Sequence, residues 1–317
     1  MNIALAFGGG GLRCAAEIGV LRTLKRRNIK IQGGAGTSFG SVVLGLHAMG
    51  VDLDAIADLF ISGKIIRTFI TAPVALQVAK MPFLTIMRQL RSEECAGLFS
   101  GNEFRDFLNN LVGHRRIEDA EFPLAIVVTD LESQKVRSIT SGDFGLAVQA
   151  SSSVPGLFCP VRIDGSLCID GGALENLPIS SVKNLVGVDA KVLAVNVNPL
   201  PNRNGSQKLG VLDLVDQLLT THFISIDSMQ SGFAEAVVMP DHGVRGWLSR
   251  RRNEELMEKA IAIGEDSANS VLDALTRRDA MRMPWQNFAP GKEPVQSNFG
   301  LSKVNPLHHS YRADYAV

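Results

Sequence analysis

Short apolar runs alternate with longer stretches of helical periodicity along most of this chain of 317 residues. Runs of four to eight aliphatic and aromatic residues, bounded by turn signals, indicate buried strands. Apolar residues fill these runs continuously, which is typical of strands that helices cover on both faces. Strands are therefore predicted at Ile3–Phe7, within Ile29–Ala35, at Leu124–Val128 and at Val192–Val197.

Helical spacing of apolar residues fills the segments between several of these runs. Ile18, Leu21 and Leu24 fall on one side of a helix predicted over Cys14–Lys25, and Ser41–Met49 is predicted to form the next one. The pattern is mostly helical from Leu209 onward, with a long helix from Asn253 to Leu275.

Turn signals place a hairpin and an irregular end. Asp164-Gly165 separates Val161–Ile163 from Ser166–Ile169, which predicts a tight antiparallel hairpin. The segment after Pro284 is rich in Pro, Gly, Asn and Ser and is predicted to be an irregular tail. No internal repeat or inter-domain linker is visible, so one α/β domain with helical insertions is expected.

Charge and cysteine content narrow the class of protein. Lys+Arg and Asp+Glu both number 32, so neither a basic surface for nucleic acid nor an acidic tail is indicated. The four cysteines show no C-x-x-C spacing and are expected to be reduced thiols of a cytosolic protein: Cys14, Cys95, Cys159 and Cys168. No apolar stretch approaches the ~20 residues of a spanning helix, and Ile3–Phe7 is too short for a signal core. A soluble protein is expected, with peripheral membrane contact left open.

A serine between two glycines follows the second predicted strand. Gly36-Thr37-Ser38-Phe39-Gly40 is the G-x-S-x-G pattern of a nucleophile elbow, in which a strand turns sharply into a helix. Small flanking residues are needed because a Cβ there clashes across the turn. The pattern is short, so it indicates a catalytic serine only if the chain also supplies residues that complete the site.

A glycine run follows the first predicted strand. Gly8-Gly9-Gly10-Gly11-Leu12-Arg13 can present backbone N–H groups at a helix N-terminus, which suits an anion. A dinucleotide pyrophosphate and the oxyanion of an acyl transfer both fit, and so does a tight turn without ligand. A dinucleotide site expects an acidic residue near the end of the second strand, where this chain has Gly33-Gly34-Ala35-Gly36, so the dinucleotide interpretation is disfavoured.

An aspartate offers a base for the serine. Asp170 ends the strand that follows the hairpin turn and precedes Gly171-Gly172, so another backbone can approach it closely. Asp-Gly is also a common turn. A serine hydroxyl needs a base near neutral pH, and an aspartate within hydrogen-bond reach can accept its proton.

The strand–glycine loop–helix, the early GTSFG and the late DGG together resemble the patatin-like phospholipases. Those enzymes use a Ser-Asp dyad and a glycine-rich oxyanion loop, without a catalytic histidine. Further segments are similar to the family: Glu17–Leu21, Val128–Leu131, Ala150–Phe158 with Pro160-Val161, and Asp170–Pro178. The resemblance covers about residues 2–200 and, more loosely, a helical part at 205–280. It implies a patatin-like three-layer α/β/α domain over 1–283 with a mainly parallel sheet, followed by the tail at 284–317.

Carried onto this chain, the resemblance makes Ser38 the nucleophile and Asp170 the general base. It implies an oxyanion hole from the amides of Gly9, Gly10 and Gly11, supported by Arg13. Two positions depart from the family: Cys14 replaces the glycine that closes the loop motif, and Glu17 stands where histidine is frequent. A Cβ at Cys14 can narrow the turn, although cysteine is acceptable once it lies inside the helix. A thiol at a helix N-terminus can have a lowered pKa and be oxidisable, but a plain buried thiol is the favoured interpretation.

Two segments could contact membranes. The Lys64–Arg91 region combines basic side chains with many apolar ones and has no acidic residue, which is typical of an interfacial lid and also of helices covering a sheet. Trp247 beside Arg250-Arg251-Arg252 suits a lipid head-group interface or an ordinary loop, and nucleic-acid binding there is less favoured.

The histidines allow a different constellation. An α/β-hydrolase order of Ser, acid and His is formally satisfied by Ser38 and Asp170 with His222 or His242. That fold places its nucleophile after several strands, whereas Ser38 follows the second. All six histidines are therefore interpreted as surface or loop residues, and no spacing supports a metal site or a cofactor.

The leading hypothesis is a serine acyl hydrolase acting on phospholipids or lysophospholipids. The alternative is a catalytically weak lipid-binding or regulatory member of the same family, in which Cys14 impairs the oxyanion loop. The protein is expected in the cytoplasm or at the membrane periphery, without nucleic acid. Head-group preference, acyl length and oligomeric state are left open.

Overall fold

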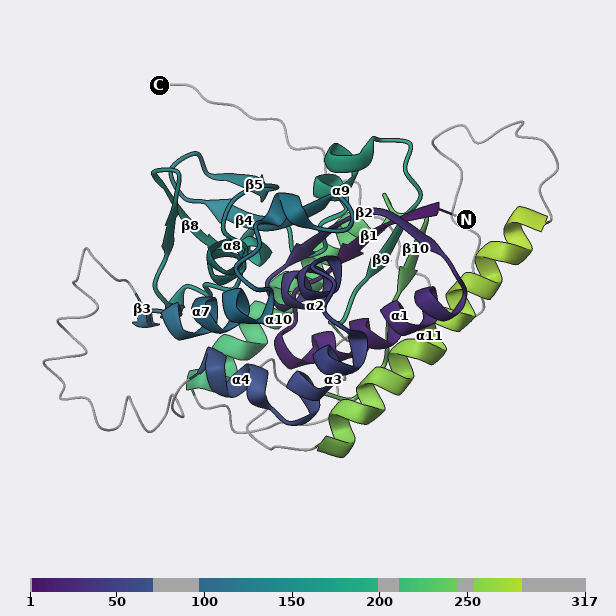
Figure 1. The fold of residues 1–317 in the computed structure, drawn as a ribbon, viewed down its shortest axis with the longest axis horizontal. Helices are drawn as coiled ribbons and strands as arrows, with labels where there is room; N and C mark the ends of the chain where they lie inside the picture. The colour runs from purple at the N-terminus through teal and green to yellow at the C-terminus, as the bar shows by residue number, and fades with distance from the viewer. Residues whose placement is uncertain (1, 71–96, 199–210, 245–253, 281–317) are drawn as a thin grey trace, which may run out of the picture. The chain divides into compact units, whose positions relative to one another are not determined.

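A mainly parallel sheet forms the centre of the computed structural model, which describes residues 2–70, 97–198, 211–244 and 254–280 (Figure 1). Eight strands of the described residues join this sheet: β1 (Asn2–Phe7), β2 (Lys30–Thr37), β4 (Leu124–Asp130), β5 (Lys135–Ile139), β7 (Val161–Ile163), β8 (Ser166–Asp170), β9 (Val192–Val195) and β10 (Ala236–Val238). The strand order is β10-β9-β1-β2-β4-β8-β7, and β5 also pairs with β4.

Parallel pairing dominates one half of the sheet and antiparallel pairing the other. β1 pairs in parallel with β2 and β9, β9 with β10, and β2 with β4. β5 and β8 run antiparallel to β4, and β7 runs antiparallel to β8. Because the carboxyl ends of parallel strands meet at one edge, the segments after β1, β2 and β9 lie close together there.

Alternate residues of the central strands enter two separate hydrophobic clusters. In β1, Ile3, Leu5 and Phe7 pack into the larger cluster, whereas Ala4 and Ala6 pack into a smaller one. Side chains of a strand alternate between the two faces of a sheet, so these clusters lie on opposite faces. This arrangement is the predicted three-layer α/β/α fold.

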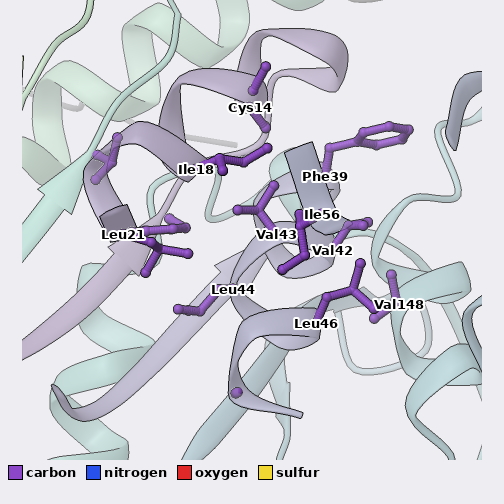
Figure 2. Close-up of a cluster of buried hydrophobic side chains, with 14 of the residues drawn as sticks. Cys14, Ile18, Leu21, Phe39, Val42, Val43, Leu44, Leu46, Ile56 and Val148 are labelled. Carbon is purple, nitrogen blue, oxygen red and sulfur yellow. The ribbon is translucent and has the colours of Figure 1, made fainter. Parts of the chain in front are cut away.

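Most helices cover the face that carries the larger cluster. Side chains of α1 (Ala15–Arg26), α2 (Phe39–Ala48) and α11 (Glu254–Ala280) belong to it, and Figure 2 shows those of α1 and α2 interlocking around Ile18 and Val43. The opposite face is covered by α9 (Ile179–Val186), through Ile179 and Val182. Full burial of such an aliphatic side chain contributes about 1.5–3 kcal/mol to stability.

Further helices continue the larger cluster. They are the short η1 (Gly11–Cys14), α3 (Leu53–Ile61), α4 (Lys64–Phe69), α7 (Asn102–Leu111) and α8 (Phe144–Ser151). The remaining described elements are η2 (Ile117–Asp119), η3 (Gly171–Ala173), α10 (Val211–Ser231), and β3 (Gly97–Phe99) and β6 (Gly156–Phe158), which pair in a small second sheet.

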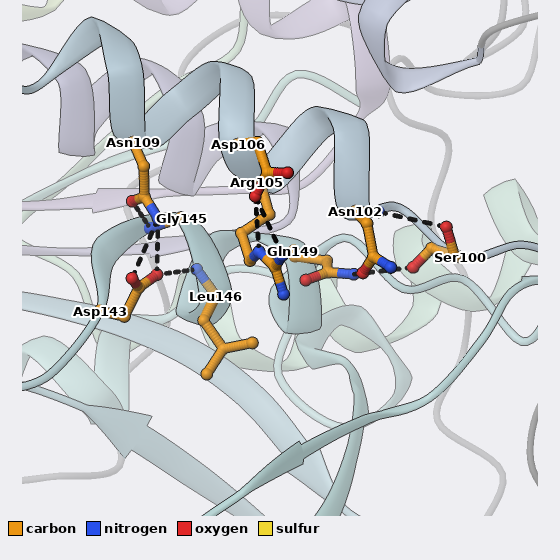
Figure 3. Close-up of polar contacts among 9 residues, drawn as sticks. All are labelled: Ser100, Asn102, Arg105, Asp106, Asn109, Asp143, Gly145, Leu146 and Gln149. Atoms are coloured by element: carbon orange, nitrogen blue, oxygen red, sulfur yellow. Dashed lines mark hydrogen bonds and ion pairs between the residues drawn. The ribbon is translucent and has the colours of Figure 1, made fainter. Parts of the chain in front are cut away.

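Polar contacts fix α8 against α7 (Figure 3). Asp143 caps α8 by accepting the Leu146 amide, and both of its carboxylate oxygens also accept hydrogen bonds from Asn109 Nδ2 of α7. Gln149 donates from Nε2 to the Ser100 carbonyl at 2.7 Å. These contacts hold α8 in place, and its last residue, Ser151, contacts the nucleophile segment.

The predicted strands and the first two helices are confirmed, with small shifts at their ends. The hairpin is confirmed as well: Asp164 and Gly165 both have positive φ, 49° and 87°, as a tight hairpin turn requires. β10 was not expected, because its three residues are too few to stand out within a segment of helical character.

The chain divides into two compact units, residues 1–276 and 277–317. The predicted tail at 284–317 lies outside the described residues, so that boundary stays a prediction.

The expectation of four reduced cysteines is wrong for Cys159, which is disulfide-bonded. Cys14 and Cys168 are free and buried, and Cys95 lies outside the described residues.

Candidate active site

Ser38 occupies a sharp turn between β2 and α2. Its φ of 51° and ψ of −129° form a strained conformation for a residue with a side chain. A Cβ on Gly40 would lie 2.6 Å from the Phe7 carbonyl oxygen, and one on Gly36 would lie 2.5 Å from the Ser41 Cα, so both glycines are required. The Ser38 amide donates to Ser151 Oγ at 2.8 Å, which ties the turn to α8. The turn leaves Ser38 only half-buried among buried neighbours.

The Ser38 hydroxyl donates directly to Asp170. Oγ lies 2.9 Å from Asp170 Oδ2, although the two residues are 132 positions apart in sequence. Asp170 ends β8 opposite Val128 of β4, and its Oδ1 accepts the Gly172 amide at 2.8 Å. A Cβ on Gly171 would lie 2.3 Å from the Val127 carbonyl oxygen, which is the close backbone approach that the sequence predicted.

Burial gives Asp170 the properties of a base near neutral pH. Loss of solvent raises the pKa of Asp170 to about 7, and the hydrogen bonds from the Gly172 amide and the Ser38 hydroxyl oppose that rise only in part. A carboxylate of this pKa is deprotonated for much of the time at neutral pH and still accepts a proton readily.

The glycine loop lies against the serine. A Cβ on Gly9 would be 3.0 Å from Ser38 Cβ, and one on Gly10 would be 2.5 Å from Val197 Cγ2, so the loop admits no side chains there. Gly11 has φ of 60°, in the left-handed region. The Gly9 amide donates to the Asn176 carbonyl at 3.2 Å, whereas the amides of Gly10 and Gly11 take part in none of the backbone hydrogen bonds of the described residues.

Arg13 lies beneath this loop and is 3% exposed. Its NH1 donates to Asn198 Oδ1 at 3.0 Å. The cation therefore reaches the loop through Asn198, a residue that the sequence analysis did not select.

The family model described as patatin-like phospholipase matches residues 5–183, which is more than half of the chain. The chain belongs to the patatin-like phospholipase family. An uncharacterized NTE family protein of Mycobacterium bovis is 35% identical over 199 residues, covering 62% of this chain and 49% of that protein. Lysophospholipase nte1 of Neurospora crassa is 30% identical over 209 residues, covering 66% of this chain and 13% of that enzyme. The chain thus spans about half the length of the bacterial relative and a smaller part of the fungal one.

Two solved structures are also similar to this chain, at lower identity. The crystal structure of VipD from Legionella pneumophila is 15% identical, with a TM-score of 0.49 over 86% of this chain and 67% of that one. The crystal structure of the type III effector ExoU gives a TM-score of 0.47 over 86% of this chain and 53% of that one. The family assignment rests on the match over residues 5–183.

The two departures from the family pattern lie together below the loop. Cys14 is fully buried in η1, and its thiol donates to the Gly8 carbonyl at 3.5 Å, so the side chain points into the core and does not narrow the turn. Burial, followed by the nearby Glu17 carboxyl, raises the pKa of Cys14 well above its usual value, while Arg13 and the Gly10 amide oppose this weakly. The favoured interpretation of Cys14 as a plain buried thiol is therefore confirmed, and the alternative of a reactive thiol with a lowered pKa is wrong. Burial also raises the pKa of Glu17, which favours its neutral form.

Neither candidate histidine joins the dyad. His222 is exposed on α10, where Nε2 lies 3.1 Å from the Ala173 carbonyl oxygen, and His242 is a buried loop residue paired with the Val197 carbonyl at 2.9 Å. Among the hydrogen bonds of the described residues, Ser38 Oγ and the Asp170 carboxylate contact each other and no histidine.

The proposed membrane segments are described only in part. Lys64 and Arg67 are exposed on α4, whereas residues 71–96 and the basic Arg245–Arg252 segment lie outside the described residues. Within the described ranges, no helix is long and apolar enough to cross a bilayer, and no cluster of three metal-ligating side chains occurs.

Three residues near the site were missed by the sequence analysis. Asn176, Asn198 and Asp227 are buried, and both asparagines donate hydrogen bonds to the Asp227 carboxylate and to the Gly9 carbonyl. Asn176 falls inside the family-like segment after Asp170, which was a usable signal. No sequence pattern marked Asp227, because a single acidic residue in a helix looks the same in sequence whether it is buried or solvated.

Proposed function

We propose that this chain hydrolyses fatty-acyl esters of phospholipids or lysophospholipids through the Ser38–Asp170 dyad. The observation that carries the proposal is the 2.9 Å hydrogen bond from Ser38 Oγ to a buried aspartate whose pKa is about 7. Family membership and the related lysophospholipases support a lipid ester as the substrate.

In the first step, Ser38 Oγ attacks the ester carbonyl carbon while Asp170 Oδ2 takes the hydroxyl proton. The tetrahedral intermediate collapses, the bond to the glycerol oxygen breaks, and the protonated Asp170 returns its proton to that leaving alkoxide. The products of this step are a deacylated glycerophospholipid and an acyl-enzyme on Ser38.

In the second step, water attacks the acyl carbonyl and gives its proton to Asp170. The intermediate then expels Ser38 Oγ, which recovers the proton from Asp170, and the fatty acid is released. Asp170 accepts and returns one proton in each half-reaction, so a single carboxylate is sufficient.

The amides of Gly10 and Gly11 are the donors proposed for the oxyanion. The Gly9 amide is already bonded to the Asn176 carbonyl, and its contribution is to hold the loop against Ser38. Loss of one oxyanion donor typically costs about 2.7–4 kcal/mol of transition-state stabilisation.

Phospholipid or lysophospholipid is the proposed partner, reached by peripheral membrane contact. The described support is limited to α4, where Lys64 and Arg67 are exposed and Ile65 and Phe69 are buried. Contact through the whole Lys64–Arg91 region, and a cytoplasmic location, stay predictions from the sequence.

Fatty-acid release from lysophosphatidylcholine and from phosphatidylcholine vesicles tests the proposal. Ser38→Ala removes the nucleophile, so hydrolysis and fluorophosphonate labelling are expected to fall by at least ~10³-fold. Ser62→Ala, at an exposed helix end, is the matched control and should retain wild-type rates. Hydrolysis that persists in Ser38→Ala contradicts the proposal, and wild-type protein that binds vesicles without releasing fatty acid supports the lipid-binding alternative.

A further inference from the structure

A second buried aspartate lies on α10, outside the dyad. Asp227 is fully buried, and none of the ion pairs among the described residues includes it. An isolated carboxylate in such a place is costly unless hydrogen bonds compensate it. The groups that donate hydrogen bonds to Asp227 therefore indicate its role.

Two asparagine amides supply those hydrogen bonds. Asn176 Nδ2 lies 3.1 and 3.0 Å from Asp227 Oδ1 and Oδ2, and Asn198 Nδ2 lies 3.1 Å from Oδ2. Asn176 follows the Asp170 turn and Asn198 follows β9, so α10 joins two segments that the sheet brings to the same edge.

The same two nitrogens reach the glycine loop. Asn176 Nδ2 donates to the Gly9 carbonyl at 3.3 Å, and Asn198 Nδ2 donates to it at 3.0 Å. Each amide nitrogen carries two hydrogens, so each can serve Asp227 and Gly9 together. Arg13 completes the arrangement by donating to Asn198 Oδ1.

The Gly9 carbonyl controls a proposed oxyanion donor. The peptide unit is planar, and the Gly9 carbonyl shares its plane with the Gly10 amide. Two hydrogen bonds on the carbonyl therefore fix the direction of the Gly10 N–H as well. A glycine loop needs such restraint, because glycine leaves backbone rotation otherwise free.

Asp227 determines which way the Asn176 amide faces. An ionised carboxylate only accepts hydrogen bonds, so it selects the nitrogen of a neighbouring amide over its oxygen. Without the carboxylate, Asn176 could turn its oxygen toward Asp227's place and lose its bond to Gly9.

We infer that Asp227 is a positioning residue that orients the oxyanion loop through Asn176, Asn198 and the Gly9 carbonyl. The inference rests on the proposed acyl-transfer function. It predicts that Asp227 affects stabilisation of the tetrahedral intermediate and leaves ground-state binding almost untouched.

The test compares Asp227→Asn with wild type using two ligands. A fatty trifluoromethyl ketone forms a tetrahedral adduct with the serine and places an oxyanion in the hole, whereas an ether-linked lysophospholipid binds without reacting. In Asp227→Asn we expect kcat and trifluoromethyl ketone affinity to fall together by about 10–100-fold, with KM and ether-lipid affinity within about 3-fold of wild type. Asp266→Asn, the same change at an exposed site on α11, is the control and should match wild type.

Thermal unfolding is measured for every variant. If Asp227→Asn does not fold, Asn198→Ala replaces it, and a smaller loss in the same pattern, about 3–10-fold, is expected because Asn176 still holds Gly9. Equal losses of affinity for both ligands, or no loss in a folded variant, overturn the inference. The proposed function still holds in either case if the wild-type protein hydrolyses lipid esters. Wild-type protein that neither hydrolyses lipid esters nor binds the trifluoromethyl ketone overturns both.

Discussion

The two ends of the parallel strands carry similar residue types in opposite environments. At the carboxyl ends, the buried Asp170 accepts a hydrogen bond from Ser38, and the buried Asp227 accepts hydrogen bonds from two asparagines that also contact the glycine loop. Near the amino end of β2 lies a hollow of about 570 Å³ whose lining includes Lys25, Lys30, His47, Asp52 and Glu121. The hollow is roomy and charged, yet most of these charged side chains are exposed to water.

Asp170 and Asp52 show the difference most clearly. Burial raises the pKa of Asp170 to about 7, and its closest side-chain partner is the Ser38 hydroxyl. Asp52 is exposed and caps α3, and the hydrogen bond from the Asp54 amide lowers its pKa. The first aspartate is destabilised and poised to take a proton, whereas the second is solvated and stabilises a helix. Desolvation around a defined partner therefore distinguishes the site better than the size of a hollow.

The largest expected effect that separates the two ends comes from Asp170→Asn. Without a base, kcat/KM is expected to fall by about 10³–10⁴-fold, as when the aspartate of a serine hydrolase is neutralised. The substitution should also raise stability, because an ionised carboxylate is removed from a buried site.

The gain in stability expected for Asp170→Asn depends on pH. The folded pKa of Asp170 lies above its unfolded value, so the fold loses stability as pH rises from about 4 to about 7, and the loss is complete above that range. At about pH 8, Asp170→Asn should unfold with about 1–3 kcal/mol more free energy than wild type, and near pH 4 with little difference. Denaturant-induced unfolding at both pH values measures this difference in stability. Lower stability of the variant at pH 8 would contradict the buried environment of Asp170.

A smaller loss is expected from closing the space between the glycine loop and the serine. In Gly9→Ala the new Cβ would lie 2.7 Å from Asn176 Oδ1 and 3.0 Å from Ser38 Cβ, so the loop must shift. We expect kcat to fall by about 10²-fold, comparable to the loss of one oxyanion donor. Gly232→Ala, where no atom lies within 4 Å of the new Cβ, is the matched control. If the two variants have equal kinetics, the glycine loop does not contribute to catalysis.

The smallest effect is expected at the opposite end of the strands. Asp52→Ala removes a helix cap and should lower Tm by about 2–4 °C, with kcat/KM within about 2-fold of wild type. Because the pKa of Asp52 is depressed by folding, its contribution is present above about pH 4 and disappears at lower pH. Melting curves at pH 7 and pH 3 test this, and a large loss of activity would show that the two ends are coupled.

The sequence allowed the dyad to be predicted but not its support. Ser38 and Asp170 each follow a recognisable strand and are flanked by glycines, so short-range patterns and the family resemblance select both. Asn198 and Asp227 have no such pattern: they approach Gly9 only because β9 pairs with β1 and α10 packs near their carboxyl ends. Whether a Cβ at Cys14 narrows the turn could not be decided from the sequence either, because the direction of this side chain depends on the turn into η1 and on the core below it. Local periodicity predicts elements, whereas these contacts depend on how distant elements pack.

The rate of fluorophosphonate labelling as a function of pH, with the modified residue identified by peptide mass spectrometry, tests the dyad most directly. We expect an adduct on Ser38 alone, a labelling rate that rises with pH through about 7, and loss of that dependence in Asp170→Asn but not in His222→Ala. An adduct on another residue, or a pH dependence that Asp170→Asn leaves intact and His222→Ala removes, would contradict a two-residue mechanism.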